Sequence, residues 1–178
     1  MTERTGLDAP VSAAGADVAG AWAAWAGAVT LVTAADGRDD VGATVSAFCP
    51  VSADPPLVLV SLMSGSYPAE LFGRDDEPVT EFAVTLLSAG QRVLAGRFAA
   101  AGRPGARLML DDVPHRRGPA SGALVPDGGL AALECSAEQL VPAGDHLLVI
   151  ARVTGVPYVT DAGEPLIRFR RHYLPARL

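Results

Sequence analysis

The sequence contains no lysine and no asparagine, and all 14 residues of its combined lysine and arginine count are arginines. Without lysine, the chain cannot supply the phosphate-binding lysine of a Walker A loop, a pyridoxal-phosphate Schiff base or a lysine nucleophile. The formal net charge of -6 disfavours a nucleic-acid-binding protein. Any anionic ligand must therefore be bound by arginine, hydroxyl groups, helix N-termini or backbone N–H groups.

Metal-ligating and thiol side chains are also scarce. Cys49 and Cys135 are the only cysteines and form no CxxC pattern, so we expect neither a zinc site nor a disulfide framework, and a reduced cytoplasmic setting fits best. The histidines, His115, His146 and His172, lie on separate segments without metal-ligand spacing, and we expect no metal site. The N-terminus lacks the basic region of a secretory signal.

Two common catalytic motifs are missing as well. There is no GxSxG, which leaves a hydrolase nucleophile elbow unsupported, and no GxGxxG, which disfavours a Rossmann domain. The acidic pairs Asp39-Asp40, Asp75-Asp76 and Asp111-Asp112 stand beside turns. We interpret them as solvated loop residues rather than as a general acid–base pair.

One uncharged run, from Val18 to Ala35, is long enough to span a membrane. It consists mostly of alanine, glycine and threonine, and its character changes midway. Val18, Trp22 and Trp25 recur at helical spacing, whereas the second half is β-branched. We therefore expect a helix from about Asp17, then a strand, and no membrane span.

The composition suits one packed domain, because 49% of the 178 residues are hydrophobic. We expect a loose tail over residues 1–15 and a single domain over residues 16–178. Segments with strand character cover residues 28–33, 41–48, 57–62, 81–86, 130–138, 146–159 and 165–169.

Helices are few in this pattern. Ser88 is a candidate N-cap for a helix that continues through Phe98. Residues 101–129 are rich in glycine, proline and arginine, and we interpret them as a surface excursion or lid rather than as core. A parallel sheet needs more helices than this to cover it. We therefore expect a closed, mostly antiparallel β-barrel flanked by a few short helices.

The segment from Gly42 to Leu62, GATVSAFCPVSADPPLVLVSL, is the most informative. It places a hydroxyl-rich strand end and loop (Thr44, Ser46, Cys49, Ser52) directly before a buried strand. Small residues there allow a flat ring system to approach the backbone, and free N–H groups can bind its polar edge. The same pattern is typical of an ordinary hairpin and turn, and the residues alone leave both interpretations open.

Five blocks along the chain carry a resemblance to a known family. They are GATVSAFCPVSADPPLVLVSL, EFAVTLLSAGQRVLAGRFA, LAALEC, GDHLLVIARV and PLIRFRRHY. In this order they closely resemble the flavin reductase family of the FMN-binding split-barrel fold, from about Ala26 to Tyr173. The resemblance implies a mainly β fold, an antiparallel, Greek-key-like split β-barrel.

The same resemblance implies an activity. It predicts an NAD(P)H:flavin oxidoreductase that transfers hydride from the nicotinamide to FMN or FAD and supplies reduced flavin to a partner monooxygenase or halogenase. Members are commonly homodimers, with each site close to the subunit boundary. Two alternatives remain: a flavin-binding protein of this fold used for another substrate, and a cofactor-free scaffold.

The resemblance also assigns site residues. The positions it places at the flavin or its phosphate are Thr44, Val45, Ser46, Ala47, Cys49, Pro50, Val51, Ser52, Ser61, Ser64, Ser66 and Thr85. Phe98, Phe169 and Tyr173 match positions near the stacked nicotinamide or the dimer interface. His146 matches a histidine beside the nicotinamide and is the expected catalytic residue, although the residues alone also allow a simple turn role. From its type alone, Cys49 is expected to be a small buried packing residue rather than a redox centre.

Four positions depart from the family pattern. Met63-Ser64 stands where Asn-Arg is frequent, and Thr85 replaces a common asparagine. In the tail, Arg168 replaces a frequent tyrosine and Arg171 a frequent glycine. These two arginines could bind a pyrophosphate or a 2′-phosphate, block the nicotinamide site, or only pair with acidic loops.

Overall fold

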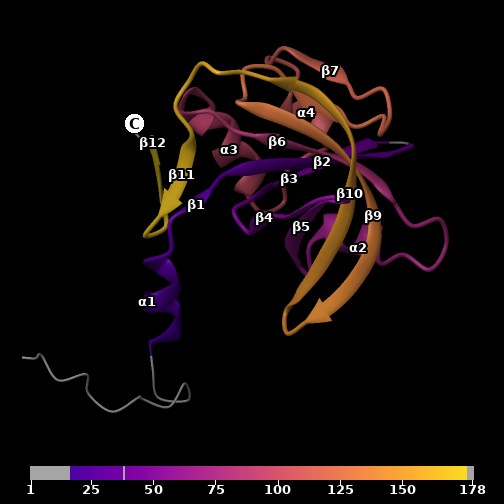
Figure 1. Ribbon diagram of the computed structural model, residues 1–178, viewed down its shortest axis with the longest axis horizontal. Helices are drawn as coiled ribbons and strands as arrows, with labels where there is room; N and C mark the ends of the chain where they lie inside the picture. The colour runs from indigo at the N-terminus through magenta and orange to yellow at the C-terminus, as the bar shows by residue number, and fades with distance from the viewer. Residues whose placement is uncertain (1–16, 38, 176–178) are drawn as a thin grey trace, which may run out of the picture.

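The computed structural model describes residues 17–37 and 39–175 (Figure 1). The tail expected over residues 1–15 lies outside this range. In the described part of the chain, seven strands form the main sheet, in the order β3-β2-β6-β9-β10-β5-β4. These strands are β2 (Thr30–Asp36), β3 (Asp39–Val45), β4 (Phe48–Ala53), β5 (Pro56–Met63), β6 (Glu81–Leu86), β9 (Ala131–Ala143) and β10 (His146–Val159).

Every neighbouring pair in this sheet is antiparallel. The two edge strands, β3 and β4, are consecutive in the chain and are joined by Ser46-Ala47. The backbone N–H of Ser61 in β5 donates to the Ala47 carbonyl oxygen at 2.9 Å, which draws this link against the sheet's other end. The sheet therefore curls into a barrel, and the predicted antiparallel split barrel is confirmed.

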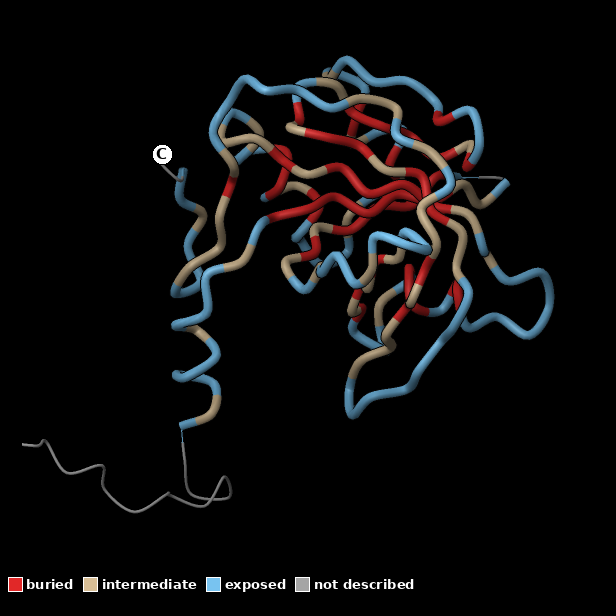
Figure 2. Tube along the Cα trace, viewed as in Figure 1, coloured by how far each residue is buried: buried red, intermediate tan, exposed pale blue. Residues whose placement is uncertain are grey.

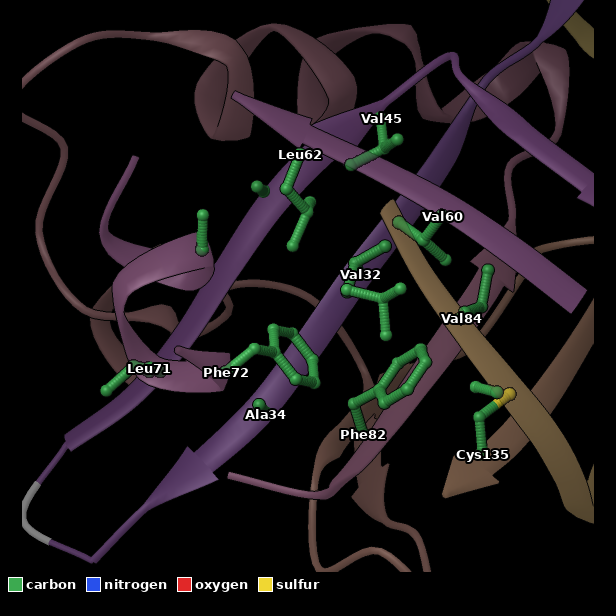
Figure 3. Close-up of a cluster of buried hydrophobic side chains, with 14 of the residues drawn as sticks. Val32, Ala34, Val45, Val60, Leu62, Leu71, Phe72, Phe82, Val84 and Cys135 are labelled. Carbon is green, nitrogen blue, oxygen red and sulfur yellow. The ribbon is translucent and has the colours of Figure 1, made fainter. Parts of the chain in front are cut away.

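The barrel interior is filled by apolar side chains (Figure 3). Strand β5 alternates, because Val58, Val60 and Leu62 are buried while the residues between them are partly exposed. Helix α2 (Tyr67–Phe72) packs against one end, where the Phe72 and Phe82 rings meet edge to face with centroids 5.2 Å apart. Figure 2 shows this buried interior against the exposed periphery.

The helix predicted after Ser88 is confirmed. It consists of a 3-10 turn, η2 (Ala89–Gln91), followed by α3 (Arg92–Ala99). Ser88 and Gln91 form a capping box, in which the Gln91 side chain accepts from the Ser88 N–H at 3.1 Å. A Cβ on Gly42 would lie 2.5 Å from the Phe98 ring, so α3 packs closely on β3 only because residue 42 is glycine.

The interpretation of residues 101–129 as a surface excursion is wrong. This segment forms α4 (Ala106–Met109), β7 (His115–Arg117) and β8 (Leu124–Pro126). Ala106, Leu110, Ala123, Leu124 and Val125 are buried. These five residues therefore extend the core, whereas Leu108 of the same segment is exposed.

Asp40 holds this segment in place, and its interpretation as a solvated loop residue is also wrong. It is only 1% exposed and accepts hydrogen bonds from Arg107 Nε at 2.5 Å and Arg117 Nη2 at 2.7 Å. Burial raises the pKa of Asp40, but the hydrogen bonds and charges of Arg117 and Arg107 outweigh it, so the net pKa lies below its ordinary value.

A second, smaller sheet stands at the side of the barrel. It pairs β1 (Gly27–Ala28), β11 (Leu166–Phe169) and β12 (His172–Pro175), the last of which was not predicted. Helix α1 (Val18–Ala23) precedes it and extends away from the barrel (Figures 1 and 2). We call α1, β1, β11 and β12 together the arm.

The run from Val18 to Ala35 divides into α1, β1 and most of β2, as its change of character predicts. Asp17 caps α1, since its Oδ1 accepts from the Gly20 N–H at 2.8 Å. Within the described residues, no helix has the length and apolar character needed to cross a membrane.

Candidate functional site

Three segments singled out in the sequence converge on one edge of the barrel. The β3–β4 link touches β5 through the bond between Ser61 N–H and the Ala47 carbonyl. The end of β5 pairs with the start of β10, where Met63 lies opposite His146. The Ser64 N–H also donates to the Asp145 carbonyl at 2.9 Å. Residues far apart in sequence thus form one continuous face, which we call the β4–β5–β10 face.

Strand β4 supplies the open edge of this face. The strand predicted over residues 41–48 was expected to lead into a loop, but Phe48–Ala53 form a separate strand paired with β5, with an irregularity between Pro50 and Ser52. Because β4 is an edge strand, part of its backbone N–H and C=O groups have no strand partner. Such groups can bind the polar edge of a ring system.

Cys49 on this strand is exposed, so the prediction of a buried packing residue is wrong. The physical reason is its place on the edge strand, whose outer residues have no further strand to cover them. Cys135 on β9 is the buried thiol. Burial, together with the nearby charges of Glu81 and Glu134, raises its pKa to about 12.

The hydroxyl groups of the face divide into two sets. Thr44 Oγ1 donates to the Ala95 carbonyl at 2.7 Å, and Ser66 Oγ accepts from the Ala69 N–H at 3.4 Å as the N-cap of α2. These two hydroxyls serve the fold. Within residues 17–37 and 39–175, the structure gives no hydrogen-bond partner to the hydroxyls of Ser46, Ser52, Ser61 and Ser64. These four hydroxyls remain available to a ligand.

His146 is the first residue of β10 and is partly exposed. Its Nδ1 lies 2.7 Å from Asp145 Oδ1, and this hydrogen bond and the histidine charge lower the pKa of the Asp145 carboxyl. A carboxylate accepts, so Nδ1 carries the proton and Nε2 is the nitrogen left for a ligand. Gly144 adopts a φ of 62°, which permits the tight turn that presents the histidine.

The structure does not bring Thr85 and Phe98 to this face. Thr85 is 0% exposed near the end of β6, and its Oγ1 lacks a hydrogen-bond partner within the described residues. Phe98 is 1% exposed in the cluster beneath α3, so its side chain packs in the core of this chain, and its place beside the nicotinamide or at a dimer interface stays a prediction. Val45 is buried as well, which leaves only its backbone for contact. The three side chains fill the core.

The tail residues form a separate group on the arm. Arg168 lies opposite Tyr173, with its guanidinium carbon 5.8 Å from the ring centroid. Arg170 stands over the Phe169 ring at 5.2 Å. Their sheet pairs β11 with β1 and β12, so these residues do not join the β4–β5–β10 face through strand pairing in this chain.

Two surface hollows, of about 350 and 540 Å³, lie at the opposite end of β10 from His146. Glu134 lines the first and is a residue that sequence reasoning missed. Its Oε1 accepts from the N–H groups of Ala120 at 3.0 Å and Ser121 at 2.7 Å and from Ser121 Oγ at 2.8 Å. The sequence predicted only that Glu134 lies in a strand over residues 130–138, and no local motif indicates that its carboxylate accepts these hydrogen bonds.

The antiparallel barrel with its open edge at β4 defines a split-barrel protein. The sequence profile of the flavin reductase like domain matches residues 22–177, and the chain belongs to this family. The predicted family membership is therefore confirmed.

Individual relatives agree with this assignment. The 4-hydroxyphenylacetate 3-monooxygenase, reductase component, of Thermus thermophilus is 36% identical over 157 residues, which is 86% of this chain and 91% of that protein. The NADH-dependent FMN reductase AsuE2 of Streptomyces nodosus subsp. asukaensis is 34% identical over 145 residues, or 82% and 76% of the two chains. Among solved structures, BorF, the flavin reductase component of a bacterial two-component tryptophan halogenase, superposes with a TM-score of 0.80 at 28% identity, covering 89% of this chain and 97% of BorF.

Proposed function

We propose that this protein is an NAD(P)H-dependent flavin reductase. It transfers hydride from the nicotinamide to FMN or FAD and supplies reduced flavin to a separate monooxygenase or halogenase. The observation that carries the proposal is the convergence of the β3–β4 link, the end of β5 and His146 on one face. The printed activities of the similar reductase components support the same conclusion.

The residues of the β4–β5–β10 face fit a flavin. Ser46 and Ser52 stand next to the open backbone edge of β4, where hydrogen-bond donors and acceptors can meet the polar edge of the isoalloxazine and the ribityl hydroxyls. Ser61 and Ser64 follow along β5 and the turn after it, and can contact the phosphate. The small side chains of Ser46 and Ala47 permit a ring to approach the backbone.

The reaction asks for positioning rather than for a nucleophile. When both are bound, nicotinamide and flavin supply the chemistry themselves, since hydride passes from C4 to N5 between stacked rings. The protein's task is to hold the two rings in contact and to exclude water. We assign His146 Nε2 the role of hydrogen-bonding the nicotinamide amide or of holding a proton near the reduced flavin; the bond from Nδ1 to Asp145, which orients the ring, supports this assignment.

A coupled assay tests the proposal. Purified protein is mixed with NADH or NADPH and with FMN or FAD, and nicotinamide oxidation is followed by absorbance. We expect turnover that depends on added flavin. Absence of turnover with all four combinations would overturn the proposal. Yellow colour retained through gel filtration would then favour a flavin-binding protein with another substrate, and a colourless protein the scaffold.

We further propose that the protein is a homodimer. In one chain the β4–β5–β10 face is an open surface, and every residue of α1 is at least partly exposed. Trp22 and Trp25 are 75% and 76% exposed, which is a large apolar area for water to solvate. A second copy that covers α1 and the two tryptophans removes this cost.

Light scattering on the purified protein tests the dimer. We expect the mass of two chains for the natural protein and of one chain for the double variant Trp22→Ser, Trp25→Ser. A natural protein that has the mass of a single chain at micromolar concentration would contradict this assembly.

We also propose a reduced cytoplasmic setting for the protein, since both cysteines are free thiols.

A further inference from the structure

The turn between β11 and β12 concentrates positive charge in an acidic protein. Arg168, Arg170 and Arg171 occur within four residues, followed by His172, in a chain of net charge -6. Among the described residues, these three arginines have no carboxylate partner. The arginines that do pair with a carboxylate are Arg74, Arg97, Arg107, Arg116, Arg117 and Arg152. The charge of this turn is therefore not neutralised within the described part of the chain.

The backbone of the turn is unusual for arginine. Arg170 and Arg171 adopt φ values of 47° and 67°, in the left-handed region that favours glycine. Non-glycine residues are strained in this region, and such strain persists where the surroundings fix the backbone. The Arg170 N–H donates to the Ala23 carbonyl at 2.8 Å, which anchors the turn to the end of α1.

Aromatic rings, rather than acids, support the guanidinium groups. Arg168 stacks near Tyr173 and Arg170 near Phe169. Arg170 and Arg171 are exposed and lie at the tip of the turn. Guanidinium groups held this way keep their N–H donors free for a planar or tetrahedral anion.

We propose that this turn binds the phosphate monoester of a nucleotide substrate. The inference rests on the proposed function, because a flavin reductase meets two such groups: the 5′-phosphate of FMN and the 2′-phosphate of NADPH. A monoester carries about -1.5 to -2 charges at neutral pH and calls for more than one cation. In a chain without lysine, the stretch Ser61–Ser66 contains no cationic residue, whereas the turn offers three arginines within four residues, of which Arg170 and Arg171 are adjacent and exposed at its tip.

Arg171→Gly tests the proposal, because glycine removes the charge and accepts the positive φ. We measure kcat/KM with NADH and NADPH, each with riboflavin and FMN. The kcat/KM of the variant is expected to fall about tenfold with the substrate that carries the monoester and to stay unchanged with the substrate that lacks it. A fall in the NADPH to NADH ratio identifies the 2′-phosphate as the ligand, and a fall in the FMN to riboflavin ratio identifies the 5′-phosphate.

Arg92→Gln is the matched control. Arg92 is an exposed arginine at the start of α3 that also pairs with no carboxylate in the part of the chain that the structure describes. Its removal changes the net charge equally and is expected to leave both ratios unchanged. Equal ratios in the natural protein and Arg171→Gly, or an equal fall in Arg92→Gln, would overturn the proposal.

A direct titration separates this proposal from the reductase assignment. We measure calorimetrically the binding of FMN against riboflavin and of adenosine 2′,5′-bisphosphate against 5′-AMP, with no turnover required. In one of these pairs, the natural protein is expected to bind the ligand with the additional monoester more tightly. Arg171→Lys should keep part of this preference, and Arg171→Gly should lose it. Catalysis with NADH and riboflavin but no monoester preference in either pair would refute the turn alone, and no catalysis with any pair would refute the reductase assignment.

Discussion

The barrel interior and the β4–β5–β10 face share strands but differ in the burial and polarity of their side chains. Inside, the side chains of β5 and β6 are apolar and buried, and Val84 and Phe82 are completely enclosed. Outside, the edge of β4 and the end of β5 present serines, an exposed thiol and backbone groups without strand partners. One region is closed and holds the fold together; the other is open and leaves its hydrogen-bonding capacity to a ligand.

This contrast teaches that stability and ligand binding are carried by separate residues here. Because successive side chains of a strand point to opposite faces, one strand can serve both regions. Val60 and Leu62 of β5 are buried, while Ser61 between them belongs to the open face. Substitutions should therefore affect either folding or catalysis, and the following experiments test that separation.

Phe82→Ala should have the largest effect, confined to stability. The ring is fully buried and meets Phe72 edge to face, so its loss should lower the free energy of unfolding by about 3–5 kcal/mol. Urea denaturation measures this, and the rate per folded molecule should be unchanged. Val93→Ala, at a position 69% exposed, should cost less than about 0.5 kcal/mol. Equal costs for the two variants would contradict the burial difference.

Asp40→Asn should have the next largest effect, lowering the free energy of unfolding by about 2 kcal/mol at neutral pH, because the three charge-assisted hydrogen bonds from Arg107 and Arg117 are weakened. The native pKa of Asp40 is lowered, so its contribution is present above its unfolded-state pKa of about 3.9 and is lost as the pH falls through the native value. The stability gap between variant and natural protein should therefore close in acid below about pH 4.

The control for this variant is Asp112→Asn, which removes the partner of Arg97 in an exposed pair. Because solvent screens this exposed pair, its loss should destabilise the protein much less than the loss of the Asp40 carboxylate. If both variants destabilise alike, the burial of Asp40 does not matter to stability.

His146→Ala should do the opposite of the two preceding variants, lowering activity without lowering stability. We expect kcat/KM for the nicotinamide substrate to fall about tenfold, equivalent to about 1.4 kcal/mol, with flavin affinity and thermal midpoint nearly unchanged. Asp145→Asn keeps the imidazole but weakens the hydrogen bond to Nδ1, so kcat/KM should fall less in this variant. An unchanged rate in His146→Ala would reduce this histidine to a turn residue.

Cys49→Ser should have the smallest effect. The side chain is exposed on an edge strand, so stability should change by less than about 0.5 kcal/mol. Activity should change less than about twofold, since the proposed hydride transfer needs no thiol. A loss of most activity would assign the thiol a role that the present geometry does not give it.

Local patterns predicted the parts of the fold that are encoded locally. The strands at residues 81–86 and 146–159 match β6 and β10, and Ser88 caps the helix it was expected to cap. These signals consist of hydrophobic periodicity and capping chemistry within a few residues. The resemblance to the family added the architecture.

Other features depend on partners distant in sequence. Asp40 is buried because Arg107 and Arg117, 67 and 77 residues away, reach it, and no local pattern contains that information. The same contacts draw residues 101–129 into the core, where their glycine and proline content predicts surface. At the site, the flavin role of the serines and His146 is a prediction from the resemblance alone, and the sequence could not show that the hydroxyls of Thr44 and Ser66 are hydrogen-bonded within the fold.

The difference between the two cysteines has a practical consequence. Cys135 is enclosed, with its pKa raised to about 12, while Cys49 is exposed beside Pro50 and Val51 on the edge of the proposed flavin face. A maleimide dye should therefore label the folded protein at one position without any engineering. Fluorescence from that single label would report flavin arrival and departure in real time, and its protection by a bound partner oxygenase would map where reduced flavin is handed over.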